Sequence, residues 1–165
     1  MIEAGYRVYI YKNMTAYLEN KGIVVHEPRI FGEKLSSGHI KQSLAEIDSF
    51  EFGIALTHTN YSDIEPLKTL VRVVNAFDRE EEFFGRVLQQ TGEMSSDGAF
   101  LKTFLCESFM AYLHDSCQVY SKVDGTNMRD YLQGILDRHN SQVEPFKRFK
   151  LGRVTVSSKT DNPYR

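Results

Sequence analysis

The sequence predicts a mainly β fold, an antiparallel small barrel or sandwich, followed by a helix–strand unit that begins a second, α+β domain. Short aromatic and β-branched runs, separated by turn residues, fill the first two thirds of the chain. One of these runs alternates with a period of two, as a half-buried strand does. A helical periodicity follows after about residue 120. We therefore expect a β-rich domain over residues 1–118 and an incomplete second domain over residues 119–165.

The first expected strand is the run Tyr6–Tyr11, whose aromatic and β-branched side chains suit a pleated, half-buried surface. Residues 20–22 are a turn signal, and an extended run restarts at residues 23–25. A further turn is expected at residues 31–34.

The clearest strand pattern lies around residue 50. Its large side chains recur at every second position and share one face: Phe50, Phe52, Ile54 and Leu56. Leu44 lies in phase with Phe50, whereas Ile47 does not, so we expect a β-bulge or a strand break near residues 47–48.

Two hairpins are expected next. The runs 70–74 and 83–88 flank the charged segment 78–82, which predicts a solvated loop between antiparallel neighbours. Residues 94–98 form a second turn signal, in which Gly98 suits a positive φ. A long strand over residues 100–108 follows it.

The C-terminal part predicts a helix. Its apolar positions recur at i, i+3, i+4, i+7 and i+8: Met128, Tyr131, Leu132, Ile135 and Leu136. Thr126 is the expected N-cap and Asn140 the expected C′ residue. Residues 153–156 predict one more strand. One helix and one strand cannot close a core, so we expect the remainder of this domain to be absent or supplied elsewhere.

Charge and hydropathy argue against two classes of partner. The net charge is −2, and no Lys/Arg-rich run provides the footprint of a nucleic-acid-binding protein. The apolar stretches are only a few residues long, too short for a transmembrane helix. We therefore expect no nucleic-acid partner and no membrane insertion.

No catalytic, cofactor-binding or metal-binding residues are predicted. The five histidines do not form a zinc spacing, and each is expected to be a surface or partly buried polar residue. Cys106 lies in an apolar strand run, where burial would raise the pKa of its thiol and make it inert. The glycines are scattered singly and form no phosphate-binding loop.

An ordered set of segments resembles the N-terminal region of phage minor tail proteins of Gram-positive hosts, the prophage tail endopeptidase or tail-associated lysin family. The segments are GHI at 38–40, EIDSFEF at 46–52, FGRVL at 84–88, LCES at 105–108, YLHDS at 112–116, MRDYLQGILDRHNSQV at 128–143 and GRVTV at 152–156. The resemblance covers residues 6–165 and rests on their order, since no single motif is specific.

The resemblance implies a tail hub, similar to the baseplate hub of contractile-tailed phages and to the hub of type VI secretion spikes. Such a protein is a homotrimer at the end of the tail tube, with the distal tail protein and the tail tube protein as partners. Its expected location is the virion tail tip, after synthesis in the bacterial host cytoplasm. No lytic domain falls within residues 1–165, so the resemblance implies a structural protein and not an enzyme.

Each subunit of a trimer needs a contact surface for its neighbours in addition to its own core. The candidate subunit-interface residues are Tyr6, Tyr9, Tyr11, Phe83 and Phe84. Adjacent Phe83 and Phe84 cannot both face inward from one regular strand, although a bulge at Gly85 or a second core under the helix would bury both. Two other functions stay open: a module that binds a cell-surface glycan or peptide, and a fragment of a cell-wall hydrolase.

Overall fold

The computed structural model describes residues 5–29, 34–94, 98–119 and 125–159. It divides into two compact units, Met1–Met110 and Ala111–Arg165, and each is described by itself. The first unit is an antiparallel half-barrel and the second contains the C-terminal helix, so the predicted fold class is confirmed. The domain boundary at residues 118/119 stays a prediction.

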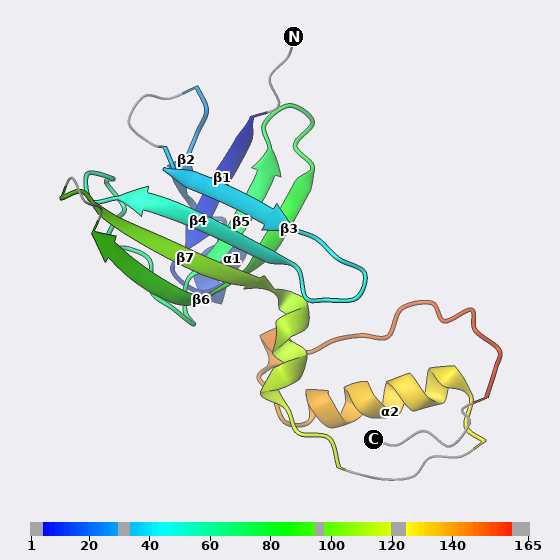
Figure 1. The fold of residues 1–165 in the computed structure, drawn as a ribbon. Helices are drawn as coiled ribbons and strands as arrows, with labels where there is room; N and C mark the ends of the chain where they lie inside the picture. The colour runs from blue at the N-terminus through cyan, green and yellow to red at the C-terminus, as the bar shows by residue number, and fades with distance from the viewer. Residues whose placement is uncertain (1–4, 30–33, 95–97, 120–124, 160–165) are drawn as a thin grey trace. The chain divides into compact units, whose positions relative to one another are not determined.

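The first unit is a single seven-stranded antiparallel sheet with the order β2-β1-β5-β6-β7-β4-β3 (Figure 1). The strands are β1 Tyr6–Tyr11, β2 Ile23–His26, β3 Ser37–Lys41, β4 Ser49–Ala55, β5 Leu70–Asn75, β6 Glu81–Met94 and β7 Phe100–Ser108. The helical segments of the chain are α1 Met14–Leu18, η1 Phe109–Asp115, α2 Met128–Asn140 and η2 Pro145–Lys147. Both predicted hairpins, β5–β6 and β6–β7, are present.

The sheet curls until its two edge strands, β2 and β3, approach each other. Leu35 lies just before β3, and its N–H donates to His26 Nδ1 on β2 at 3.1 Å. A cavity of about 400 Å³ is lined by residues of both edges. We call the opening between β2 and β3 the seam of the half-barrel.

The apolar core lies on the concave face of the sheet. Phe50 stacks on Phe52 at 5.2 Å between ring centroids, and Phe52 stacks on Phe104 at 5.1 Å. Phe50, Phe52 and Ile54 are buried, as the alternation predicts. The prediction for Leu56 is wrong, because β4 ends at Ala55 and the Leu56 side chain is exposed.

The expected irregularity before Phe50 is a strand break. Residues 42–48 separate β3 from β4, and Leu44 is fully exposed in this connection. The sheet also contains irregularities that the sequence did not predict. The β5–β6 register shifts between Val73 and Val74, and the β6–β7 register shifts between Val87 and Gln89.

Phe83 and Phe84 lie on opposite faces of β6. Phe83 joins the main core. Phe84 packs on the convex, outer face against Tyr17 of α1, at 4.4 Å between ring centroids, and against Phe109 at 4.5 Å. A second, smaller aromatic cluster thus accommodates Phe84, and neither register shift lies at Gly85.

The second unit is built around α2. The predicted N-cap is shifted by one residue, because Asn127 Oδ1 and not Thr126 accepts the Asp130 N–H, at 2.8 Å. Asn140 is the last helical residue, and Ser141 caps the helix in a right-handed conformation. Residues 153–156 form no strand, so that prediction is wrong. Within the described residues of this unit, β-pairing amounts to one isolated bridge between Asn127 and Lys159.

Candidate functional site

The five aromatic residues proposed for a subunit interface do not share one surface. Side chains of a strand alternate between faces, and Tyr6 accordingly lies at the seam whereas Tyr9 and Tyr11 lie on the outer face. Tyr6 is 42% exposed, but Tyr11 and Phe83 are 2% and 4% exposed. These two offer a partner almost no area, and Phe84 is covered by the aromatic cluster under α1.

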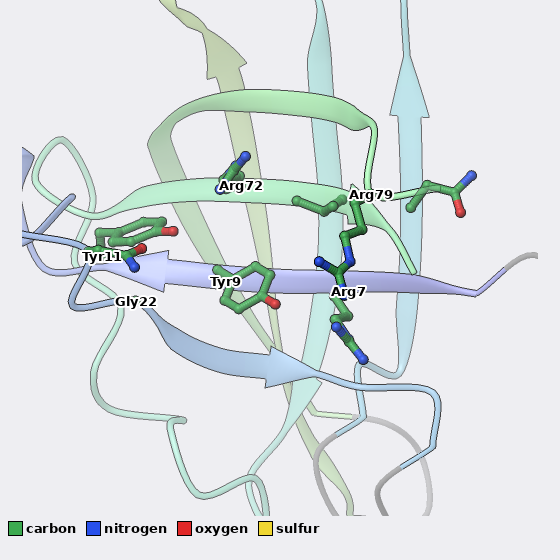
Figure 2. A pocket seen from close by; sticks show the side chains of 9 residues that line it. Arg7, Tyr9, Tyr11, Gly22, Arg72 and Arg79 are labelled. Carbon is green, nitrogen blue, oxygen red and sulfur yellow. The ribbon is translucent and has the colours of Figure 1, made fainter. Parts of the chain in front are cut away.

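A cavity of about 560 Å³ lies on the outer face of β1 and β5 (Figure 2). We call it the arginine pocket. It is lined by Arg7, Tyr9, Tyr11, Asn20, Gly22, Arg72, Val74, Asn75 and Arg79. The sequence analysis singled out only Tyr9 and Tyr11 of this set.

Strand register positions the centre of the arginine pocket. Arg7 and Tyr9 are two residues apart on β1 and therefore share its outer face. Arg72 on β5 is the direct cross-strand partner of Tyr9. Figure 2 shows Tyr9 between Arg7 and Tyr11 along β1, with Arg72 on the neighbouring strand. The pocket floor is thus set by the sheet itself and needs no loop to form.

Two of the arginines are held by carboxylates. Arg7 Nε donates to Oε2 of Glu27, whose side chain is almost fully buried. Arg72 Nε donates to Glu81 Oε2 at 2.7 Å. The hydrogen bond with Glu27 raises the pKa of Arg7. Burial opposes the charge of Arg72, but hydrogen bonds to Glu81 and Tyr11 outweigh it and raise the pKa of Arg72.

Arg79, the third arginine of the pocket, lies in a turn that backbone hydrogen bonds hold. Arg79 N–H donates to Asn75 O at 3.0 Å, and Asn75 N–H donates to Glu80 O at 2.9 Å. Arg79 has a positive φ of 65°, which is uncommon for a residue with a long side chain. Its guanidinium makes no hydrogen bond or ion pair with any described residue. Figure 2 shows Arg79 extending from its turn over β1 toward Arg7 and Tyr9.

The end of α1 supplies the opposite rim of the arginine pocket. Asn20 N–H donates to Tyr17 O at 2.9 Å, and Lys21 N–H donates to Ala16 O at 2.8 Å, which is the Schellman pattern. The positive φ of Asn20, 55°, is therefore explained by a helix cap. A Cβ at Gly22 would lie 2.8 Å from the Tyr11 ring, so glycine permits this close approach.

The seam cavity combines aromatic, apolar and imidazole groups. Tyr6, His26, His39 and Ile40 are among its lining residues. Burial lowers the pKa of His26, and the nearby positive charge of Lys34 lowers it further. The Leu35 N–H that bonds His26 Nδ1 requires an unprotonated nitrogen, so the neutral ring is the form that closes the seam.

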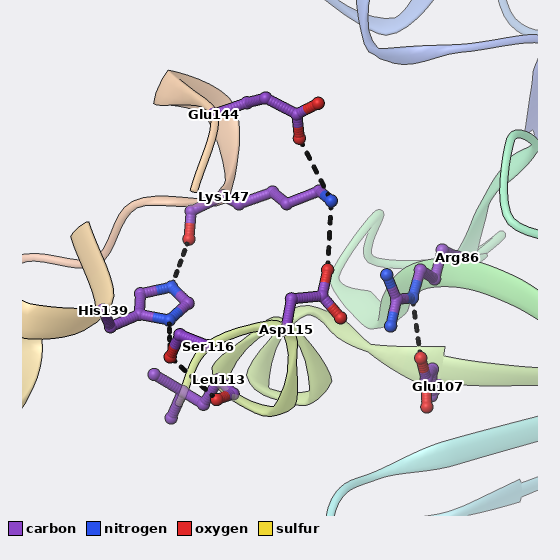
Figure 3. Close-up of polar contacts among 8 residues, drawn as sticks. All are labelled: Arg86, Glu107, Leu113, Asp115, Ser116, His139, Glu144 and Lys147. Carbon is purple, nitrogen blue, oxygen red and sulfur yellow. Dashed lines mark hydrogen bonds and ion pairs between the residues drawn. The ribbon is translucent and has the colours of Figure 1, made fainter. Parts of the chain in front are cut away.

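Two histidines are buried, contrary to the sequence prediction. His58 Nδ1 accepts the Asn60 N–H, and its Nε2 bonds Val25 O at 2.9 Å. His139 is 0% exposed. Its Nδ1 lies 2.8 Å from Ser116 Oγ, and its Nε2 lies 3.0 Å from Lys147 O (Figure 3). Both rings satisfy backbone and side-chain groups of their own unit, which is a structural role.

Figure 3 also shows two ion-pair systems, one in each unit. In the second unit, Lys147 Nζ lies 3.0 Å from Asp115 Oδ2 and 3.1 Å from Glu144 Oε2. In the first, Arg86 Nε donates to Glu107 Oε1 at 2.6 Å across β6 and β7. The carboxylates are neutralised by these cations, so neither system forms an acid–base pair of carboxyl groups.

The remaining group whose reactivity the sequence analysis considered is the thiol of Cys106. Cys106 is buried, and burial raises the pKa of its thiol, as the sequence predicts. Within residues 5–29, 34–94, 98–119 and 125–159, no group of three His, Cys, Asp or Glu side chains is placed to hold a metal ion. None of the described helices has the length and apolar character needed to cross a membrane.

No protein-family model and no curated protein matches the chain. The crystal structure of the tail protein from Neisseria meningitidis MC58 is similar over 79% of this chain and 32% of that chain, with 19% identity and a TM-score of 0.47. The crystal structure of the 43 kDa tail protein of prophage MuSo2 from Shewanella oneidensis is similar over 82% of this chain and 38% of that chain, with 12% identity and a TM-score of 0.53. The chain therefore spans about a third of the length of each, and the second similarity shows a shared fold.

Proposed function

We propose that the chain is a structural component of a phage tail, and that its place is the hub at the tail tip. The shared fold with the prophage MuSo2 tail protein is the observation that supports a tail role. The hub, the homotrimer and the contacts with the tail tube and distal tail proteins come from the resemblance of the sequence segments. In this proposal the protein assembles in the host cytoplasm and remains in the virion.

The proposal assigns no catalysis to residues 1–165. Cys106 is buried with a raised thiol pKa, which makes this thiol a poor nucleophile. His58 and His139 are buried and are bonded to backbone groups of their own unit. A general base needs access to the proton that it abstracts, and neither ring has that access. These placements favour a structural protein over the fragment of a cell-wall hydrolase.

The proposed trimer contact is at the seam. Tyr6 is exposed there, and β3 is an edge strand whose outer side has no partner strand in the sheet. Edge strands offer unpaired backbone groups to another chain. A contact from the seam of one subunit to a different surface of the next would close a ring.

The solution mass of the protein by light scattering, over a range of concentrations, tests this contact. We expect a mass near three times 19.0 kDa for the natural sequence. Tyr6→Asp should give a monomer, because a charge would be buried at the contact. Val156→Asp, which changes an exposed side chain in the second unit, is the matched control and should leave the trimer intact. A natural protein that stays monomeric at every concentration would contradict a trimer contact within these residues.

The tail role itself has an independent test. Virions purified from the encoding phage or induced prophage should contain peptides of this chain by mass spectrometry. Immunogold labelling should place them at the end of the tail tube. Their absence from purified virions would contradict the tail role whatever the oligomeric state.

A further inference from the structure

We propose that the arginine pocket is a binding site for an acidic saccharide, a sugar unit that carries one carboxylate. The pocket lies on the outer face of β1 and β5, away from the proposed trimer contact at the seam. The inference goes beyond the tail role, because it gives this domain a ligand of its own. The volume of the arginine pocket, about 560 Å³, is within the range of roughly 300–1,000 Å³ for small-molecule sites.

The charges in the arginine pocket leave one cation uncompensated. Glu27 pairs with Arg7, and Glu81 pairs with Arg72. Arg79 has no acidic partner among the described residues. A ligand with a single negative group would neutralise the pocket, and the planar guanidinium can hold a carboxylate through two parallel hydrogen bonds.

The loop between β5 and β6 fixes the position from which the Arg79 side chain extends. A left-handed conformation is unfavourable for a non-glycine residue. At Asn20 the same conformation ends a helix, whereas at Arg79 it occurs in the hairpin loop that joins β5 to β6. Two backbone hydrogen bonds hold this loop, and the exposed Arg79 side chain extends from it to line the arginine pocket.

The other groups of the arginine pocket match a sugar ring. Tyr9 supplies a half-buried aromatic ring at the centre of the floor, against which the apolar C–H face of a pyranose can pack. Asn20 and Asn75 supply carboxamides from two different rims. Asn75 Oδ1 accepts the Phe77 N–H at 2.9 Å, which orients its NH₂ group as a donor. Aromatic, amide and guanidinium groups together recognise C–H, hydroxyl and carboxylate groups.

An acidic peptide fits the arginine pocket less well. Peptides that bind sheets by strand addition use the backbone groups of a free edge. The pocket residues come from the faces of β1 and β5, and each of these strands is paired on both sides. A phosphate group carries more charge than the one cation left over. The single carboxylate of a uronic acid is therefore the better match.

Isothermal titration calorimetry and saturation-transfer NMR test the proposal, with trigalacturonic acid as the probe and maltotriose as the neutral control. We expect millimolar or tighter binding of the acid and at least about tenfold weaker binding of maltotriose, since one charge-assisted contact is lost. Arg79→Gln and Tyr9→Leu should each weaken acid binding by about tenfold. Arg153→Gln, a change of an exposed arginine in the second unit, should leave it unchanged.

Three results would overturn the proposal. Binding of trigalacturonic acid that is unaffected by Arg79→Gln would place any site elsewhere. Equal binding of a tetraglutamate peptide or of inorganic phosphate would show general anion binding. Failure of trigalacturonic, glucuronic and sialic acids to bind a correctly folded protein would exclude the site. Because both assays measure ligand binding, their outcomes are separate from the light-scattering and virion tests of the tail role.

Discussion

Each of the two units of the chain is stabilised internally by a different kind of interaction. The half-barrel buries a continuous apolar cluster that includes Phe52, Phe104 and Val87. In the described part of the second unit, by contrast, the buried residues are Ala111, Tyr112 and His139. The apolar stripe of α2 is only half-buried. Hydrophobic burial is the dominant favourable term in folding, so the first unit has a larger source of stability than the described part of the second.

Polar links between side chains and backbone replace part of that burial in the second unit. Gln142 bonds both the N–H and the carbonyl of Cys117, at 3.0 Å each. Asn140 makes the same pair of bonds with Phe149, at 2.9 and 2.8 Å. Each carboxamide thus binds the N–H and the carbonyl of one residue, as a paired residue on a neighbouring strand would. Such bonds contribute about 1 kcal/mol each, which makes the second unit the more easily opened part.

The largest effect is expected from a substitution in the core of the half-barrel. Phe52→Ala removes a ring that stacks on Phe50 and Phe104, and we expect a loss of about 3–5 kcal/mol in the free energy of unfolding. Leu132→Ala, on the half-buried stripe of α2, should cost about 1 kcal/mol or less. The chain has no tryptophan, so urea unfolding followed by circular dichroism is the measurement. Equal losses for the two variants would contradict the contrast between the units.

Two glycines of β6 test how closely the strands of the half-barrel are packed. A Cβ at Gly85 would lie 2.0 Å from the backbone oxygen of Glu107, whereas a Cβ at Gly92 would meet nothing within 4 Å. Gly85→Ala should therefore cost about 1–3 kcal/mol. Gly92→Ala is the matched control in β6 and should be neutral or slightly stabilising. If both variants unfold at the same urea concentration, β6 and β7 are farther apart than the structure places them.

The polar links of the second unit are tested at His139. His139→Phe keeps an aromatic ring but leaves Lys147 O and Ser116 without their imidazole partner, for a cost of about 1–3 kcal/mol. Hydrogen exchange should accelerate at residues 111–119 and 144–149 and stay unchanged in the β-strands of the first unit. Uniform acceleration across both units would mean that they unfold as one.

Strand positions were the most predictable part of the fold. The alternation around Phe52 and the Gly98 turn, where φ is +82°, correctly located β4 and the start of β7. The helix α1 was missed because its five residues are too few to show a period. The strand expected at residues 153–156 failed for a different reason. Extended residues become a strand only when a neighbour pairs with them, and propensity does not supply that neighbour.

The candidate site was only partly predictable. The sequence analysis singled out Tyr9 and Tyr11 but grouped them with Tyr6, which lines the other cavity. Arg72 and Arg79 are brought to the arginine pocket by a pairing between β1 and β5 that skips three strands in sequence. The neutralisation of Arg7 by Glu27 also depends on that tertiary placement. Charge composition could not reveal the pocket, because its cations are balanced by carboxylates elsewhere in a chain of net charge −2.

The smallest expected effect concerns the pH dependence of the seam. The pKa of His26 is lowered in the folded protein by burial, then by Lys34 and His58, with Glu27 acting in the opposite direction. Below about pH 6.5 the unfolded chain therefore binds a proton at His26 that the folded chain does not yet bind. The titration of His26 therefore lowers the free energy of unfolding as the pH falls through that value, and it has no effect on that free energy at higher pH.

Replacement of His26 by asparagine isolates this contribution. The carboxamide that this change introduces can still accept the Leu35 N–H but does not titrate, so His26→Asn should lose less stability than the natural protein between about pH 7.5 and pH 5. The difference should be a fraction of the loss caused by Phe52→Ala, because His26 is only partly buried. Thermal unfolding across this pH range measures it, and carboxylates that titrate in both proteins cancel in the comparison. Parallel pH profiles would show that the imidazole contributes no pH-dependent closure at the seam.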